Sequence, residues 1–306
     1  MKVSTLQLRL HTTTKIYTLQ LKSLISTVGL RLITNQKLLK MKISLITACY
    51  NSAGTIKTAI ESVLSQRNAE IEYIVVDGGS TDGTVDIIKE YSTRSTRSTR
   101  LTFKWLSEKD RGMYDAINKG IKMATGDIVG ILNADDVLAA DDTLAKIAAQ
   151  FEENIDALYA DIRFVKTGDS VEDLRNAQTV RYCSASRFKP WMFRFAVMVP
   201  HPSFYCRREC FDRLGMYSLD YRICADFELV LRFLGIAKLP SKYLPECVVV
   251  MRMGGASTAG WRSNIEINRE DLRALKTNGI WSCLPLIYLK YFFKIWGFIF
   301  PSLSSK

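Results

Sequence analysis

The sequence predicts an α/β fold in which a mixed, mainly parallel sheet is flanked by helices. From residue 43 onward, short apolar segments of strand length alternate with segments whose apolar residues recur at helical spacing, which is typical of repeated βα units. Polar loops follow several of these strands. The chain has 306 residues, 47% of them hydrophobic and 24% charged, which fits a globular protein and argues against a disordered, collagen-like or polytopic membrane chain.

The first two βα units show the pattern most clearly. A strand over 43–48 precedes apolar residues at helical spacing between Ile56 and Leu64, and a strand over 72–77 precedes a helix that ends near Tyr91. The loops after both strands therefore lie at the carboxyl edge of the sheet, where open α/β sheets bind ligands. Beyond these units we expect strands over 101–106, 128–132 and 157–161, and helices before residue 128, over about 142–151 and over 225–234.

The net charge of +11 is concentrated at the two ends of the chain. Residues 1–40 hold seven Lys or Arg and residues 280–306 hold three, and neither segment contains an acid. Between them, 32 basic residues nearly balance 31 acidic ones. Basic ends on a neutral body favour contact with an anionic membrane surface, and they leave no basic face for nucleic acid.

The seven cysteines are odd in number and include no Cys-x-x-Cys pair, so we interpret them as free thiols in a reducing compartment such as the cytoplasm. Cys206 and Cys210 stand four residues apart, but the chain has only two histidines. We therefore favour a buried thiol pair over a zinc site.

The first 40 residues lack the order of a secretory signal, and Met41 directly precedes the first strong strand. We expect translation to begin naturally at Met41, which would make residues 1–40 a non-native extension.

The segment 280–300 is the one that approaches the length of a transmembrane helix. Pro285, Lys290 and Lys294 disfavour a span, because a lysine at the centre of an inserted helix costs about 2.5 kcal/mol or more. We expect an amphipathic helix that lies in the membrane interface, with its aromatic residues in the headgroup boundary and both lysines against anionic lipid. The alternative is a terminal helix that packs on the protein's own core.

Four acidic residues follow predicted parallel strands, and two of them are adjacent. Asp135 and Asp136 stand side by side after a buried strand, where two carboxylates repel one another. A bound Mg²⁺ or Mn²⁺ would remove that repulsion, and a substrate diphosphate would complete its ligands. Neither the glycine pattern of dinucleotide-binding proteins nor a Walker lysine occurs. The other two acids are Asp77 and Asp82.

Four stretches of the chain, taken in order, resemble glycosyltransferase family 2. The most specific one reads Asp-Arg-Gly-Met-Tyr-Asp-Ala-Ile-Asn-Lys-Gly, and Ala-Thr-Gly-Asp and Leu-Asn-Ala-Asp-Asp follow it. The resemblance covers nearly all of residues 41–260 and points to the branch that builds bacterial surface polysaccharides. It implies the GT-A fold, which is Rossmann-like, and a nucleotide-sugar donor. The stretches are 43–65, 72–84, 108–136 and 201–232.

The resemblance also implies roles for individual residues. Asn133 stands where the family often has the first acid of an Asp-x-Asp motif, so the metal is expected on Asp135 and Asp136. Gly78 stands where many members carry a second acid. The residues that the resemblance assigns to the nucleotide sugar are Thr47, Asn51, Asp77, Asp115, Lys119, Asn133 and Asp135.

Two further residues are assigned to the acceptor side. Asp226 matches the acid of the family's Glu-Asp motif, which implies that it is the general base. A carboxylate suits that role because the acceptor hydroxyl must lose its proton as it attacks the anomeric carbon. His201, in Pro-His-Pro-Ser-Phe, matches a position near the acceptor.

We therefore expect a cytoplasmic, metal-dependent inverting glycosyltransferase of the hexosyltransferase type, peripheral on the inner face of the cell membrane. It would transfer a sugar from a nucleotide sugar, with a UDP-sugar as the expected donor, to a lipid-linked glycan in capsule or other polysaccharide biosynthesis. Two alternatives stay open: a polyprenyl-phosphate sugar synthase, which would not need Asp226 as a base, and a catalytically silent nucleotide-sugar-binding subunit, which Asn133 suggests. The expected parts are the extension 1–40, a nucleotide-sugar-binding half over 41–165, an acceptor-binding half over 166–265 and a helical, membrane-associating tail over 266–306.

Overall fold

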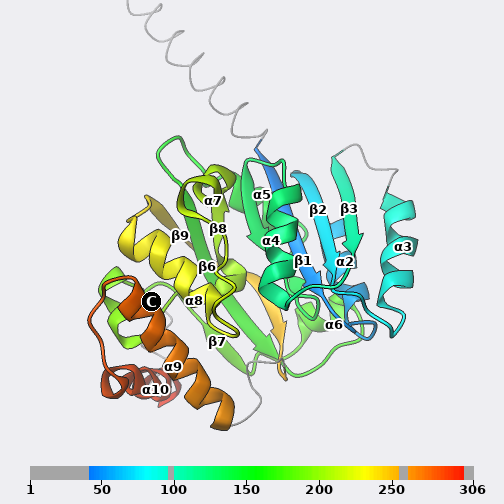
Figure 1. Ribbon diagram of the computed structural model, residues 1–306. Coiled ribbons are helices and arrows are strands. Elements are labelled where there is room, and N and C mark those ends of the chain that lie inside the picture. The colour runs from blue at the N-terminus through cyan, green and yellow to red at the C-terminus, as the bar shows by residue number, and fades with distance from the viewer. Residues whose placement is uncertain (1–40, 96–99, 255–260, 300–306) are drawn as a thin grey trace, which may run out of the picture. The chain divides into compact units, whose positions relative to one another are not determined.

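Nine strands of the described chain form one mixed sheet (Figure 1). The computed structural model describes residues 41–95, 100–254 and 261–299, and the chain from Met41 onward clusters as one unit. The expectation for residues 1–40 lies outside the described residues. The strands are β1 (Lys42–Cys49), β2 (Glu70–Asp77), β3 (Leu101–Ser107), β4 (Ile128–Ile131), β5 (Val137–Leu138), β6 (Ala157–Val165), β7 (Arg181–Cys183), β8 (Tyr205–Arg207) and β9 (Ser241–Arg252).

The strand order is β3-β2-β1-β4-β8-β6-β9-β5, and β7 pairs with β6. The strands β3, β2, β1 and β4 pair in parallel, and so do β6 and β9. β8 runs antiparallel to both β4 and β6, so β6 points the same way as β4. The predicted class, an α/β protein with a mainly parallel sheet, is confirmed. The carboxyl ends of β1, β2, β3 and β4 therefore share one edge of the sheet.

The helices follow the strands as the apolar spacing predicts. The segment expected as one helix over 225–234 is α-helical only at its start and continues as a π-helical turn to Ile236. The α-helices are α2 (Ile56–Leu64), α3 (Thr84–Ser95), α4 (Met113–Met123), α5 (Thr143–Ala148), α6 (Val171–Asn176), α7 (Arg208–Leu214), α8 (Ala225–Val230), α9 (Trp261–Thr277) and α10 (Leu284–Ile299), and the other helical turns are η1 (Pro190–Phe195), η2 (His201–Ser203) and η3 (Leu231–Ile236).

The sheet has an apolar core on each face, because successive side chains of a strand point to opposite sides. Leu45 packs with residues of α2 such as Ile60 in one cluster. Its neighbour Ile46 packs in the other cluster with Ile117 of α4 and Phe227 of α8. Figure 1 shows α4 lying along β1 and β2 on this second face. The helices of the two faces thereby hold the loops at the carboxyl edge on a rigid base.

One carboxylate is fully buried near the start of β2. Ser44 Oγ donates to one oxygen of Glu72 over 2.6 Å, the backbone N–H of Thr125 donates to the same oxygen over 2.7 Å, and Lys104 Nζ lies 2.6 Å from the other. Burial alone would raise the pKa of Glu72, but these donors lower it to about 2. The charged side chain thus joins β1, β2, β3 and the turn before β4.

The C-terminal helices pack on the protein rather than apart from it. Lys290 of α10 is buried, and its Nζ lies 2.7 Å from Oδ2 of Asp271 on α9. The expectation that Lys290 meets anionic lipid is therefore wrong, because a partner 19 residues earlier in the chain draws it inward. The side chain of Lys294 lies outside the described residues. Within the described ranges, no helix is long and apolar enough to cross a membrane.

Candidate active site

Asp77, at the end of β2, shapes the loop that follows it. One of its oxygens accepts hydrogen bonds from the backbone N–H groups of Gly79 and Ser80, each over 3.0 Å, and from Ser107 Oγ over 2.7 Å. Its other oxygen accepts from the hydroxyl of Ser80. Burial would raise the pKa of Asp77, but these donors hold its pKa below the usual range. Asp77 is therefore a charged carboxylate that fixes the glycine-rich loop.

The loop after β1 is fastened to the glycine-rich loop by side chains. Asn51 has a left-handed backbone with φ of 49°, and its Oδ1 accepts a hydrogen bond from the N–H of Thr81 over 3.0 Å. Asp82 accepts from the N–H of Ala53 over 2.9 Å. Thr47 does not reach this edge, because its buried hydroxyl bonds to that of Tyr73 inside the sheet. Of Thr47, Asn51 and Asp77, three of the residues assigned to the nucleotide sugar, the structure links Asn51 and Asp77 through Ser80.

The acidic turn after β4 contains an unpaired buried oxygen. Asp136 is fully buried, and its Oδ2 accepts a hydrogen bond from Asn133 Nδ2 over 2.8 Å. Its Oδ1 has no hydrogen-bond partner among the described residues. Burial, together with the adjacent charge of Asp135, raises the pKa of Asp136 well above its ordinary value. Asp135 is only partly buried, so its carboxylate is the more open of the two.

An arginine that the sequence analysis did not identify holds the acidic turn after β4 in place. Arg252, at the end of β9, donates from one nitrogen to the backbone oxygen of Asp135 over 2.6 Å. Its other terminal nitrogen donates to Thr58 Oγ1 and to the oxygen of Gly168, each over 3.0 Å. Only its position just before a glycine pair hinted at a role, since its partners are far away in the sequence.

These residues fit a divalent cation. Two adjacent carboxylates, one of them with an orphaned oxygen, are a hard-oxygen donor set that a cation would stabilise. The described residues form no cluster of three or more His, Cys, Asp or Glu that could hold a metal. A cation on Asp135 and Asp136 would therefore need ligands from a bound substrate.

Asp115 and Lys119 both bond to residues of the loop before α4. Asp115 accepts a hydrogen bond from the N–H of Arg111 over 3.1 Å, and this bond, with the charge of Arg111, holds its pKa below the usual range. Lys119 donates to the oxygen of Lys109 over 2.9 Å and lies 2.9 Å from a carboxylate oxygen of Glu108. Both side chains fix the loop at the carboxyl edge, beside the glycine-rich loop.

The loop before α4 also explains the glycine at position 78. A Cβ on Gly78 would lie 2.5 Å from Oδ2 of Asp110, well inside contact distance. The carboxylate of Asp110 thus lies against the position where many family members carry a second acid. Gly78 lacks the second acid of the family pattern, and the loop before α4 brings the carboxylate of Asp110 to the same place.

Asp226 lies in the first turn of α8, beside Tyr114 of α4. The hydroxyl of Tyr114 donates to the backbone oxygen of Ile223 and lies 3.2 Å from Asp226 Oδ1, and the N–H of Phe227 donates to that carboxylate oxygen over 2.8 Å. The described part of the chain makes no hydrogen bond to Asp226 Oδ2, and the residue is partly exposed. The Tyr114 ring stacks on Tyr217, 5.6 Å between centroids.

His201 supports this cluster from η2. Its Nε2 lies 2.7 Å from the hydroxyl of Tyr217. Burial lowers the pKa of His201, and the charge of Asp226 opposes that shift only in part, so the imidazole is neutral at neutral pH. The structure links His201 to Asp226 through two tyrosines, Tyr217 and Tyr114.

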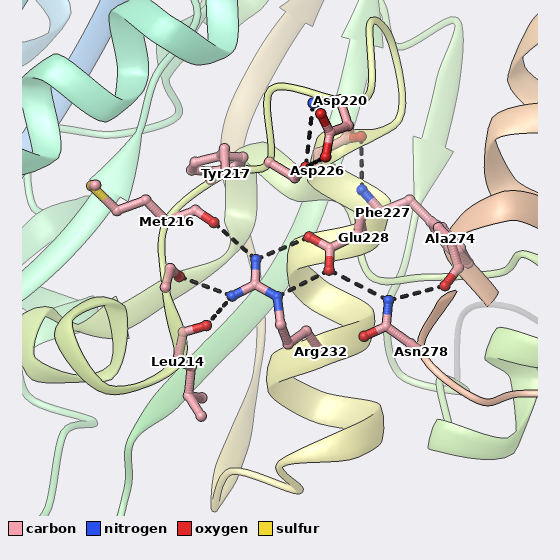
Figure 2. Close-up of polar contacts among 12 residues, drawn as sticks. Leu214, Met216, Tyr217, Asp220, Asp226, Phe227, Glu228, Arg232, Ala274 and Asn278 are labelled. Atoms are coloured by element: carbon pink, nitrogen blue, oxygen red, sulfur yellow. Dashed lines mark hydrogen bonds and ion pairs between the residues drawn. The ribbon is translucent and has the colours of Figure 1, made fainter. Parts of the chain in front are cut away.

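Tyr217 and the turn before it are fixed by Asn118 and Arg232, to which the sequence analysis assigned no role. Asn118 of α4 accepts from the N–H of Tyr217 over 3.0 Å and donates to its oxygen over 2.8 Å. Arg232 bonds Glu228 through two contacts of 2.9 Å and also donates to the backbone oxygens of Leu214, Gly215 and Met216, as Figure 2 shows for the last turn before Tyr217. Tyr114 and Asn118 both stand inside the motif that carries the family resemblance.

The base of α8 is held by the C-terminal helices. Glu270 of α9 accepts hydrogen bonds from the three consecutive backbone N–H groups of Arg222, Ile223 and Cys224, each over 2.9 Å. Burial would raise the pKa of Glu270, but these N–H groups lower it. Asp226 follows two residues later, so its backbone is set by α9.

Polar loops and an acidic turn at the carboxyl edge of a mainly parallel sheet, with a carboxylate across from them on α8, define a protein of the GT-A class. The chain belongs to glycosyl transferase family 2, whose family model matches residues 44–215. The predicted family and fold are thereby confirmed.

Known proteins similar to this chain are glycosyltransferases. A "PGL/p-HBAD biosynthesis glycosyltransferase" of Mycobacterium bovis (strain BCG / Pasteur 1173P2) is 29% identical over 234 residues, which cover 76% of this chain and 83% of the relative. The mannosyltransferase PcManGT from Pyrobaculum calidifontis, solved with GDP-Man and Mn²⁺, has a TM-score of 0.56 at 21% identity over 82% of this chain and 69% of that one. S. aureus TarS 1-349, solved with UDP, has a TM-score of 0.54 at 19% identity over 78% of this chain and 65% of that one. At these identities the two structures show the shared fold.

Proposed function

We propose that this chain is an inverting glycosyltransferase that moves a sugar from a UDP-sugar to a hydroxyl of a lipid-linked glycan. The observation that carries the proposal is Asp226, a partly exposed carboxylate with one oxygen held by Tyr114 and Phe227 and the other left without a partner in the described chain. Solved proteins of the same fold are known in complex with UDP, UDP-GlcNAc or GDP-Man, which supports a nucleotide-sugar donor here.

In this proposal the donor binds against the loops at the carboxyl edge. Asn51 and the glycine-rich loop that Asp77 organises would receive the nucleotide, and Thr47 would contribute only through the shape of β1. Asp115 and Lys119 would act by fixing the loop before α4 next to the donor. The rigidity of these loops matters because a donor held in one orientation loses less entropy at the reacting centre.

We further propose that Asp135 and Asp136 hold Mg²⁺ or Mn²⁺, with Asn133 orienting Asp136. The cation would neutralise the charge that develops on the departing nucleoside diphosphate. A solved protein of this fold contains Mn²⁺ together with GDP-Man, which supports this choice of metal.

The proposed chemical step uses Asp226 as the general base. Asp226 Oδ2 would take the proton of the acceptor hydroxyl as that oxygen attacks the anomeric carbon, opposite the departing diphosphate, and the configuration would invert. A positioned carboxylate contributes about 10²- to 10⁴-fold to such a step. Neutral His201 would hold Tyr217 on the acceptor side, and Tyr217 would hold Tyr114 by stacking.

The acceptor and its location extend the proposal. The proposed acceptor is a lipid-linked glycan in polysaccharide biosynthesis, which the enzyme would reach from the inner face of the cell membrane. The basic, acid-free segment 280–306 supports contact with that membrane. Peripheral membrane contact through 280–300 would bring the enzyme to this acceptor. The absence of a basic face on the neutral body gives no support to nucleic-acid binding.

The experiment is release of UDP from a panel of UDP-sugars with Mn²⁺ and with membranes as the acceptor source. We expect release from one sugar, and we expect Asp135→Ala to abolish it. Asp142→Ala is the matched control, because Asp142 makes only an exposed ion pair with Lys146. Binding of the donor without any turnover, for UDP-, GDP- and dTDP-sugars alike, would replace the proposal with the silent binding subunit that Asn133 suggests.

A further inference from the structure

The described part of α10 carries apolar residues on its outward side as well as its inward side, where Ile287 is buried in the core. Leu284, Pro285, Tyr288 and Leu289 are exposed, and they lie within about 140° of the helix surface. Lys290 is buried on the opposite side beside Asp271. A surface helix of a globular protein normally presents polar residues to solvent, so the exposed apolar side of α10 departs from that pattern.

A second element adjoins this outward side. Ser282, just before α10, donates from its hydroxyl to the backbone oxygen of Arg194 in η1 over 2.7 Å, and η1 packs against α10. Trp191 and Arg194 share one face of η1, because side chains three residues apart eclipse one another in a 3₁₀ helix. Trp191 is 63% exposed and Trp281, beside Ser282, is 70% exposed. We call Trp191, Trp281, Leu284, Tyr288 and Leu289 the aromatic face.

The charged residues next to the aromatic face in η1 are basic. Lys189 and Arg194 are exposed, and in the described chain neither forms an ion pair. The sequence contains no Asp or Glu between residues 174 and 208 or between 280 and 306. Tryptophan and tyrosine favour the boundary between lipid and water, and basic residues beside them add attraction to anionic headgroups.

We infer that the aromatic face docks on an anionic lipid bilayer. The sequence predicted membrane contact through residues 280–300 alone, whereas this face also includes η1. The apolar side chains of α10 enter the interface, while Lys189 and Arg194, rather than Lys290, meet the headgroups. The inference extends the proposed function by naming the surface through which the enzyme meets its lipid-linked acceptor, and it rests on that function only for the acceptor.

The same helices connect the aromatic face to Asp226. The buried pair of Lys290 and Asp271 joins α10 to α9, and the adjacent Glu270 holds the three N–H groups that precede α8. The helices that carry the aromatic face are therefore joined to the segment before α8, so docking would set the distance of Asp226 from the membrane surface.

The test is co-sedimentation of the full chain with phosphatidylcholine vesicles that contain phosphatidylglycerol. We expect binding to these vesicles and weak binding to pure phosphatidylcholine. The double variant Trp191→Ser/Trp281→Ser should bind the anionic vesicles about tenfold more weakly. Ile236→Ser is the matched control, since Ile236 is an exposed apolar residue on η3 outside the aromatic face, and it should bind as the unaltered chain does.

Equal binding by the double variant, or no binding by the unaltered chain, would overturn the inference. A dimer of the unaltered chain that the double variant loses in sedimentation velocity without lipid would also overturn it, because a second copy would then cover the face. Hydrolysis of the donor by water, measured without vesicles, separates the two proposals. This hydrolysis should be unchanged in the double variant. If vesicle binding fails while hydrolysis is intact, the docking proposal is contradicted and the proposed glycosyltransferase activity is not.

Discussion

At the scale of single residues, the site shows how one loop compensates for another. Gly78 leaves room for the Asp110 carboxylate. A Cβ at position 78 would force that carboxylate to move. Asp110 also accepts a hydrogen bond from the N–H of Gly112 over 2.9 Å, so it is fixed at the start of α4. A negative charge is thus present beside the glycine-rich loop although the sequence lacks the usual second acid there.

Gly78→Ala is expected to raise the KM for the donor about tenfold, because the new Cβ displaces Asp110 and with it the loop before α4. Asp110→Ala in the same chain should remove the clash and recover part of the loss. Steady-state kinetics of the single and double variants measure this coupling. Additive effects of the two substitutions would show that residues 78 and 110 do not share this space.

The sequence predicted some site residues and not others for a physical reason. Asp226 stands in a motif whose residues are close in the chain, and Asp77 directly ends a strand, so local patterns located both. Tyr217 is held by Asn118, 99 residues away in the sequence, and the turn before it by Arg232, which donates to the oxygen of Met216 across 16 residues, and no local pattern records such contacts. Lys290 was misplaced for the same reason, since lysine favours solvent unless a distant acid such as Asp271 draws it in.

At the scale of elements, α9 determines where α8 begins. The carboxylate of Glu270 accepts from three backbone N–H groups that otherwise lack partners at the start of a helix. Tyr114 of α4 holds the same segment from the other side, through the backbone oxygen of Ile223. The sequence predicted the helix of Asp226 but not this support, because residues 222–224 carry no capping side chain of their own.

Glu270→Gln should lower kcat about tenfold and leave the KM for the donor unchanged, because the neutral side chain holds the base of α8 less firmly while the donor loops are untouched. Glu270→Asp should retain a higher kcat than Glu270→Gln but restore less than half of the lost kcat, because the shorter side chain reaches fewer of the three N–H groups.

Glu266→Gln on the same helix is the control for this prediction. Glu266 makes an exposed ion pair with Arg222, 3.6 Å between the charged atoms, and its loss should leave both constants as they are. A donor KM that rises with Glu270→Gln as much as kcat falls would point to a general loss of structure instead.

At the scale of the whole molecule, the buried Glu72 joins three strands and the turn before β4 far from the proposed chemistry. Its folded pKa of about 2 lies below the ordinary value of 4.5. A carboxyl group with a lowered folded pKa stabilises the protein fully above its unfolded pKa. That contribution is lost as the pH falls from about 4.5 towards 2.

Glu72→Gln should lower the free energy of unfolding at pH 7 by about 2 kcal/mol, the typical value of hydrogen bonds to a charged group. Its stability should also fall less steeply than that of the unaltered chain between pH 5 and pH 3. Urea unfolding at a series of pH values measures both effects. Parallel stability curves over this pH interval would show that Glu72 does not titrate with a lowered pKa.

The account's central claim is that Asp226 removes the proton of an attacking hydroxyl. The most direct measurement is sugar transfer to the lipid-linked acceptor by Asp226→Asn, together with calorimetry of donor binding. Asp220→Asn, which changes an exposed carboxylate six residues earlier, is the control.

We predict that Asp226→Asn loses at least about 10²-fold in kcat while it binds the donor as before, and that Asp220→Asn does neither. If Asp226→Asn keeps its turnover, the attacking group needs no base. The claim would then be contradicted in favour of a synthase in which a polyprenyl phosphate attacks the donor.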